Sequence, residues 1–189
     1  MENFTLNTDA DGVALITWDM PGKTMNVIDT IVMDELDALI ERVETDDDIK
    51  AAILTSGKKT FGAGADLTMM QSMLAGYSEM KSKDGDKAIA TLFDAASRLS
   101  LSLRRLETGS KPWVAAINGT ALGGCFEIAL ACHARVMTDD ESATVGLPEV
   151  NVGLLPGGGG TQRIARLVNP QDGVQMLLQA KPHRPKKAK

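Results

Sequence analysis

Two short apolar segments, residues 51–55 and 113–117, constrain the fold most strongly because each has the length and composition of a buried strand. Apolar runs without alternation are typical of a sheet that is covered on both faces. Residues 13–18 predict another strand, and helices are expected over residues 29–44, 87–106 and 124–131. Strands that alternate with helices predict an α/β fold. We expect the three strands to share one core sheet.

The rest of the chain predicts shorter elements. A methionine-rich helix is expected to begin near Asp66, and residues 76–87 are polar enough to predict a mobile excursion. Short strands are expected near residues 135–138 and 143–145, followed by a helix over residues 162–168. We expect one domain over residues 1–180. The basic residues 181–189 are interpreted as a solvated tail, or alternatively as the point at which a longer protein was cut.

Composition excludes several classes of function. A net charge of -5 gives no reason to expect nucleic acid as a partner. No apolar run approaches the ~18 residues that a membrane span needs, and the N-terminus lacks the pattern of a secretory signal, so a cytoplasmic protein is expected. Cys125 and Cys132 would lie about 10 Å apart along one helix, too far for a disulfide. With only two histidines besides, no metal site is expected.

Two glycine-containing segments, residues 61–66 and 119–124, share one design. Each follows a predicted strand and opens a predicted helix, so each presents unpaired backbone N–H groups and the positive end of a helix dipole. If they face one point, they would form an oxyanion hole. Taken singly, each segment is equally consistent with a tight strand-to-helix turn. Neither segment fits the fingerprint of a phosphate loop or of a dinucleotide site.

Two glutamates stand in apolar surroundings. Glu127 lies within an apolar helix with no neighbouring base, where a buried carboxylate is costly and its pKa is raised. This setting favours a role in proton transfer over a place on an exposed helix edge. Glu149 follows a Gly-Leu-Pro turn, and this segment alone favours the interpretation of Glu149 as a surface turn acid over a catalytic one. His133 is interpreted as structural.

Three segments in order carry a family resemblance: FGAGADL at residues 61–67, NGTALGGCFE at 118–127 and GLPEVNVGLLPGGGGTQR at 146–163. Together they resemble the enoyl-CoA hydratase/isomerase, or crotonase-like, family, most nearly the hydratase part of bacterial multifunctional fatty-acid β-oxidation proteins. The resemblance implies a spiral of β-β-α units. The family's C-terminal helices, and the dehydrogenase domains of its multifunctional members, find no counterpart after Lys189, so activity of this chain by itself is an open question.

The resemblance also implies a reaction. Hydration of a 2-enoyl-CoA thioester to 3-hydroxyacyl-CoA would use Glu127 and Glu149 as an acid and base pair. The backbone N–H groups of Ala65 and Gly124 would hold the enolate oxygen. Coenzyme A belongs to the substrate, so no separate cofactor is implied, and Lys58 and Lys59 are candidates for its phosphates. Contacts with the acyl-CoA are implied at Ala63, Gly64, Asp66, Leu67, Gly123 and Gly146.

Other functions stay open from the sequence. A Δ3,Δ2-enoyl-CoA isomerase needs only one acid/base residue, although the presence of two glutamates favours hydration. The chain could also be an inactive acyl-CoA-binding fragment, or a subunit whose role is assembly with a thiolase. The resemblance implies a homo-oligomer or a thiolase complex for a full-length parent.

Overall fold

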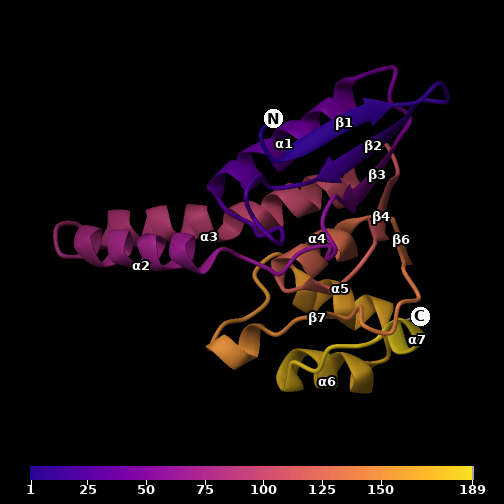
Figure 1. Cartoon of the computed structure of the whole chain (residues 1–189). Coiled ribbons are helices and arrows are strands. Elements are labelled where there is room, and N and C mark those ends of the chain that lie inside the picture. Colours follow the sequence, from indigo (N-terminus) through magenta and orange to yellow (C-terminus); the bar gives the residue numbers. More distant parts are fainter. Residues whose placement is uncertain (189) are drawn as a thin grey trace.

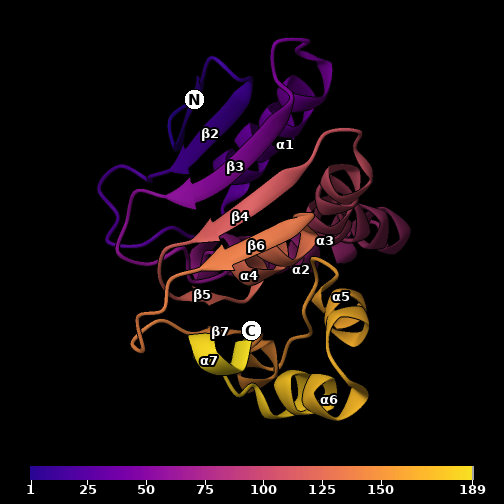
Figure 2. The same ribbon diagram turned by 90° about the vertical axis from the view of Figure 1, so that its right-hand side faces the viewer.

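The computed structural model describes residues 1–188 and contains a five-stranded sheet in the order β1-β2-β3-β4-β6. The first pair of strands is antiparallel and the remaining pairs are parallel (Figures 1 and 2). The prediction that β2, β3 and β4 share one sheet is therefore confirmed. The strands are β1 (Phe4–Thr8), β2 (Val13–Trp18), β3 (Ala51–Ser56), β4 (Trp113–Ile117) and β6 (Ala134–Met137).

A second, two-stranded sheet lies beside the first. It pairs β5 (Ala121–Leu122) with β7 (Val145–Gly146), and Gly62 forms an isolated bridge to Ala121. β4 and β6 each run from the large sheet into a strand of the small one, and a helix follows each. The chain therefore turns repeatedly through β-β-α units, as expected for a spiral.

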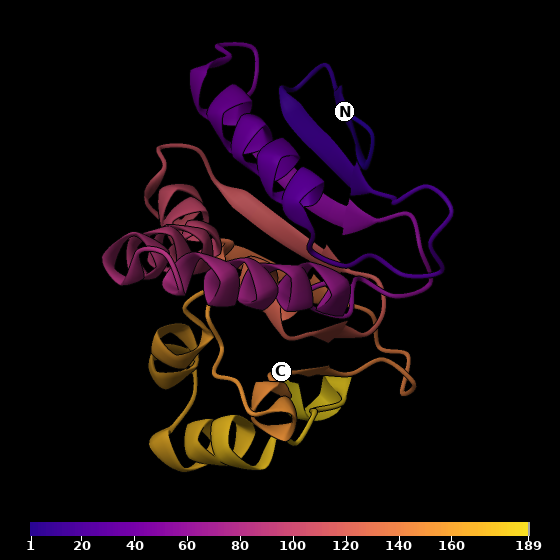
Figure 3. The same cartoon turned by 90° about the vertical axis from the view of Figure 1, so that its left-hand side faces the viewer.

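Helices lie on one face of the large sheet. α1 (Thr30–Thr45) packs there (Figure 3). Asp29 caps the N-terminus of α1 by accepting the Val32 N–H at 2.8 Å. The opposite face carries Ile53 and Val114, which are only half-buried. The expectation that this sheet is covered on both faces is thus wrong. Inward residues of the apolar strands alternate with partly exposed ones, because only one face meets helices.

α2 (Leu67–Lys81) and α3 (Gly85–Thr108) form a hairpin that projects from the body (Figure 1). Residues 76–87, predicted as a mobile excursion, form the tip of this hairpin: both helices continue into them and only a tight turn separates the helices, while their mobility stays a prediction. In that turn, Asp84 is the N-cap of α3, and its side chain accepts the Lys87 N–H at 3.0 Å. Arg98 then ties α3 to α1 through ion pairs of 2.6 Å with Asp34 and 3.0 Å with Asp37.

The centre of the molecule is α4 (Gly124–Ala131), in which all eight residues are buried. It packs against α3, α5 and β4. Since no residue of this helix faces solvent, any charged side chain on it must find its partners inside the protein.

The C-terminal part is helical. It contains the 3-10 helix η1 (Glu149–Val152), α5 (Gly160–Leu167), α6 (Pro170–Gln179) and the short α7 (Pro185–Ala188). Most of residues 181–188 are exposed, as expected for a solvated tail, but one of them is not. His183 is buried, and its N–H and C=O both bond Val145, at 2.8 and 2.9 Å. Lys189 lies outside the described residues, and the boundary at residue 180 stays a prediction.

Among residues 1–188, no helix combines the length and the apolar composition that crossing a bilayer requires.

Candidate active site

Glu127 lies on the first turn of α4, and its side chain is held entirely inside the protein. The residue is 2% exposed. Its Oε2 accepts the Gly158 N–H at 2.9 Å, and its Oε1 accepts the Gly160 N–H at 2.6 Å. Burial raises the pKa of Glu127, while the two N–H donors and the charge of Arg163 oppose that rise. A place on an exposed helix edge is therefore excluded.

The glycine run before α5 forms the seat of this carboxylate. A Cβ on Gly158 or on Gly160 would lie 2.9 Å from a Glu127 oxygen, and Gly159 has a φ of +95°. Glycine is needed here because the backbone itself approaches the carboxylate and turns through the left-handed region. From the sequence, this run was only a part of the third segment that carries the family resemblance, and its role in holding a carboxylate was missed.

Arg163 supports the glycine run on the side away from Glu127, by bonding the Gly158 carbonyl. It is buried on α5, and its Nη1 donates to the Gly158 carbonyl at 2.6 Å. Its Nε and Nη2 pair with the two oxygens of Glu107, each at 3.3 Å. Neither residue was singled out from the sequence. The sequence around Arg163 gives no sign of this role, because its partner Glu107 lies on a distant helix.

Glu149 opens η1 directly after the turn that follows β7. Its Oε2 is buried and finds no hydrogen-bond partner among the described residues. Burial, reinforced by the negative charge of Glu127, raises the pKa of Glu149 to about 7, while its own backbone N–H opposes the rise. Its Oε1 would lie only 3.1 Å from a Cβ on Gly123, which has a φ of +56°. The structure thus places Glu149 against the N-terminus of α4.

The two glutamates, 22 positions apart by their residue numbers, are close enough in space for one charge to act on the other. Their surroundings differ. Glu127 has both oxygens bonded by backbone donors, whereas Glu149 has a free, buried oxygen. Such a difference separates the proton affinities of two neighbouring carboxyl groups.

The first glycine loop lies against the second. Gly64 has a φ of +95°, and a Cβ there would lie 3.9 Å from the Gly124 nitrogen. The neighbouring Ala65 forms a bridge with Ile28, but that bridge is made by the Gly64 carbonyl and the Asp66 N–H. Within residues 1–188, neither the Ala65 nor the Gly124 N–H donates a hydrogen bond. Their convergence on one oxygen stays a prediction.

Cys125 joins the two loops. Its Sγ accepts the Gly64 N–H at 3.1 Å, and a Cβ on Gly62 would lie 2.6 Å from the same sulfur. The side chain is fully buried, which raises the pKa of the thiol to about 12. Cys125 therefore stays protonated and serves as a packing and hydrogen-bonding group. Cys132, also free, is buried at the end of α4.

The other predicted contact residues have mixed settings. Asp66 caps α2 by accepting the Thr68 and Met69 N–H groups at 2.8 and 3.1 Å, and these bonds lower its pKa. Ala63 and Leu67 are exposed, while the Gly146 carbonyl accepts the Gly123 N–H at 2.9 Å.

Three further residues carried a prediction from the sequence: Lys58, Lys59 and His133. Lys58 Nζ forms an ion pair with Asp19 Oδ1 at 2.5 Å, and Lys59 is exposed. His133 Nδ1 accepts the Trp113 N–H at 3.1 Å, which agrees with a structural interpretation.

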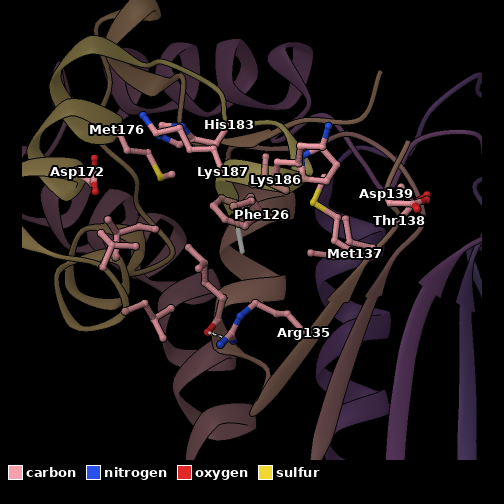
Figure 4. Close-up of a pocket in the computed structure, with 18 of the residues that line it drawn as sticks. Phe126, Arg135, Met137, Thr138, Asp139, Asp172, Met176, His183, Lys186 and Lys187 are labelled. Carbon is pink, nitrogen blue, oxygen red and sulfur yellow. Dashed lines mark hydrogen bonds between the residues drawn. The ribbon is translucent and has the colours of Figure 1, made fainter. Parts of the chain in front are cut away.

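A cavity of about 1020 Å³ lies on another side of α4. Figure 4 shows Phe126 at its centre, between Met176 and Met137, with His183 and Lys187 nearby. Neither Glu127 nor Glu149 lines it. Because neither of the unpaired N–H groups, those of Ala65 and Gly124, lines this cavity, we do not assign the site to it.

Solved structures share this fold. An enoyl-CoA hydratase from Geobacillus kaustophilus matches with a TM-score of 0.82 and 30% identity, over 100% of this chain and 65% of its own length. DspI from Pseudomonas aeruginosa matches with a TM-score of 0.81 and 35% identity, over 100% of this chain and 70% of its own. The repeated β-β-α turns and these likenesses define a crotonase-like fold.

The sequence assigns the family. Residues 8–189 match the profile of the enoyl-CoA hydratase/isomerase family, and the chain belongs to that family. Among curated relatives, the fatty acid oxidation complex subunit alpha of Idiomarina loihiensis is 42% identical over 98% of this chain. The subunit of the same name from Shewanella oneidensis is 40% identical over 99% of it. The chain spans only about a quarter of the length of these relatives, 24% and 25%.

Proposed function

We propose that this chain catalyses the hydration of 2-enoyl-CoA thioesters to 3-hydroxyacyl-CoA in fatty-acid β-oxidation. One observation carries the proposal: Glu127 is fixed by two backbone donors beside Glu149, whose Oε2 is buried and unpaired. Family membership and relatives named as fatty acid oxidation subunits support it. The reaction needs only water and the thioester.

The roles of the two glutamates follow from their surroundings. Burial raises the pKa of Glu127, but two N–H donors and Arg163 oppose that rise and stabilise the ionised form. Because Glu149 has no such donor on its Oε2, we assign Glu127 as the base. Glu149, with a pKa of about 7, keeps a proton near neutral pH and is the acid. Glu127 takes a proton from water as the water oxygen bonds to Cβ. The electron pair of the double bond moves toward the thioester oxygen, and Glu149 delivers a proton to Cα. Proton exchange, directly or through solvent, resets the pair.

Negative charge on the thioester oxygen would be met by the N–H groups of Ala65 and Gly124. Neither group is engaged elsewhere among the described residues, and Gly124 lies at the positive end of α4. Loss of one such donor typically costs roughly 10²–10³-fold in rate. For assembly, we propose a homo-oligomer or a complex with a thiolase; the relatives' name, fatty acid oxidation complex subunit alpha, supports assembly into a complex without naming the partner.

A second candidate is a Δ3,Δ2-enoyl-CoA isomerase. The occupation of both Glu127 oxygens by backbone donors favours it, because Glu149 is then the one carboxylate with a free oxygen. An isomerase would use that single group to take a proton from Cα and return it to Cγ.

The two candidates differ in their products. Purified chain is incubated with crotonyl-CoA and, separately, with a 3-enoyl-CoA, and the products are resolved by chromatography and mass spectrometry. Hydration predicts that crotonyl-CoA gains the mass of one water. Conversion of the 3-enoyl to the 2-enoyl thioester, with crotonyl-CoA unchanged, would instead select the isomerase. Unchanged thioesters in both reactions would contradict both activities and leave acyl-CoA binding.

A further inference from the structure

The Gly158 peptide has a different partner on each side. Its N–H donates to Glu127 Oε2 at 2.9 Å, while its carbonyl accepts from Arg163 Nη1 at 2.6 Å. The same guanidinium makes a two-pronged ion pair with Glu107 at 3.3 Å. A continuous chain of contacts therefore runs from α3, through Arg163 and one peptide, to the glutamate on α4.

We propose that Arg163 is a positioning residue for Glu127, holding the Gly158 peptide so that its N–H fixes the carboxylate. The proposal rests on the proposed function only in taking Glu127 as the base. Arg163 acts through the peptide and makes no hydrogen bond to Glu127 itself among the described contacts.

The geometry leaves little freedom for this arrangement. A Cβ on Gly159 would lie 2.6 Å from Arg163 Nη1, so the loop is closely packed on the guanidinium as well as on the carboxylate. Arg163 is 6% exposed, and a planar fork with several donors suits a peptide carbonyl and a carboxylate at once. Gly157, by contrast, has open space where a Cβ would stand.

The charges around Arg163 also affect the pKa of Glu127. The positive charge of Arg163 on α5 favours the ionised form of Glu127. Glu149 on η1 is the neighbouring group whose negative charge interacts with that of Glu127. Glu107 on α3 neutralises part of the arginine's field, and Arg104 shares that acid through an ion pair of 2.9 Å. Removing Arg163 should therefore raise the pKa of Glu127, whereas removing the charge of Glu107 should lower it.

These opposite signs give a test that does not depend on activity. The full chain, with isotope-labelled glutamate, is titrated by NMR, and Glu127→Gln identifies the signal. Arg163→Met should raise the Glu127 midpoint by about one pH unit, as loss of a nearby opposite charge does. Arg166→Met removes an exposed arginine from the same helix and should leave the midpoint in place. An unchanged midpoint in Arg163→Met would overturn the proposal.

Glu107→Gln keeps the test decisive if Arg163→Met fails to fold. Glutamine preserves the volume and one oxygen acceptor for Arg163, and the Glu127 midpoint should fall. A midpoint that stays or rises in Glu107→Gln would overturn the proposal.

Kinetics separate positioning from general stability. Arg163→Lys keeps the charge but loses the fork, so kcat for crotonyl-CoA should drop by roughly 10–10²-fold with KM nearly unchanged. A folded Arg163→Lys protein with the unmodified kcat would contradict positioning. If the unmodified chain hydrates nothing while the midpoints shift as expected, the proposed function fails and this inference stands. If the unmodified chain hydrates crotonyl-CoA but the Glu127 midpoints do not move, this inference fails and the proposed function stands.

Discussion

Glu127 Oε1 accepts a hydrogen bond of 2.6 Å from the backbone N–H of Gly160, a residue 33 positions further along the chain. The other oxygen is held by Gly158. Glu149 has no comparable restraint on its Oε2. One carboxylate is therefore fixed by the backbone, and the other keeps an oxygen available for proton transfer.

Gly160→Ala should lower kcat for crotonyl-CoA hydration by about 10²-fold, because small displacements of a catalytic group have effects of this size. The new Cβ would stand 2.9 Å from Glu127 Oε1 and equally close to Leu147, so the carboxylate must move. Gly157→Ala is the matched control, since a Cβ there meets nothing within 4 Å. Equal rates in the two alanine variants would contradict the seat described for Glu127.

The pH profile should report Glu149. As the acid in hydration, Glu149 must carry its proton, so kcat/KM should fall as pH rises through about 7. In an isomerase the same group acts first as a base, and kcat/KM would rise through that pH. Steady-state rates with crotonyl-CoA measured across neutral pH, with a salt control, distinguish these signs. A flat profile around pH 7 would contradict both roles.

Stability should depend on the same group. The pKa of Glu149 is raised in the folded state from 4.5 to about 7, so its protonated form favours folding below pH 4.5 and this advantage disappears as pH rises through 7. Glu149→Gln removes the charge penalty. We expect its free energy of unfolding to exceed that of the unmodified chain at pH 8 by on the order of 2 kcal/mol, with a smaller difference at pH 5. Denaturant titrations at both pH values measure this, and a difference independent of pH would contradict it.

Cys125→Ala should weaken both folding and catalysis. It removes the sulfur that accepts the Gly64 N–H, leaving a buried donor unpaired at a cost of about 1–3 kcal/mol. Because Gly64 precedes Ala65, kcat/KM should fall as well. Cys132→Ala is the control: the hydrogen bond of its Sγ among the described residues goes to the Ile128 carbonyl, at 3.5 Å, and the variant should lose stability without a matching loss of kcat/KM. Parallel losses in both variants would mean that Cys125 acts only through packing.

Local sequence was enough to predict several parts of this structure. The strands at residues 13–18, 51–55 and 113–117 were recognised from apolar composition, because burial in a sheet requires it. Helix α4 and the unusual position of Glu127 within it were also visible, since a carboxylate among apolar residues is costly wherever it lies. The exposed face of the sheet could not be predicted, because composition does not say which face of a sheet packs against helices.

The surroundings of the site could not be predicted in the same way. Gly158, Gly160, Arg163 and Glu107 act through contacts between segments that are far apart in sequence, such as the 56 positions between Arg163 and Glu107. Each residue by itself fits a turn or a solvated face. The turn between α2 and α3 was predicted as mobile from its polarity, although Asp84 uses that polarity to cap a helix.

The central claim is that Glu127 and Glu149 act as a base and an acid on one bound thioester. It is tested most directly by the rate of crotonyl-CoA hydration in Glu127→Gln and in Glu149→Gln, with thioester affinity measured in parallel by calorimetry. Both changes keep the side-chain shape, so each should lower kcat by roughly 10²–10⁴-fold while thioester affinity persists through the backbone donors. A Glu149→Gln protein that hydrates crotonyl-CoA at the unmodified rate would contradict the account.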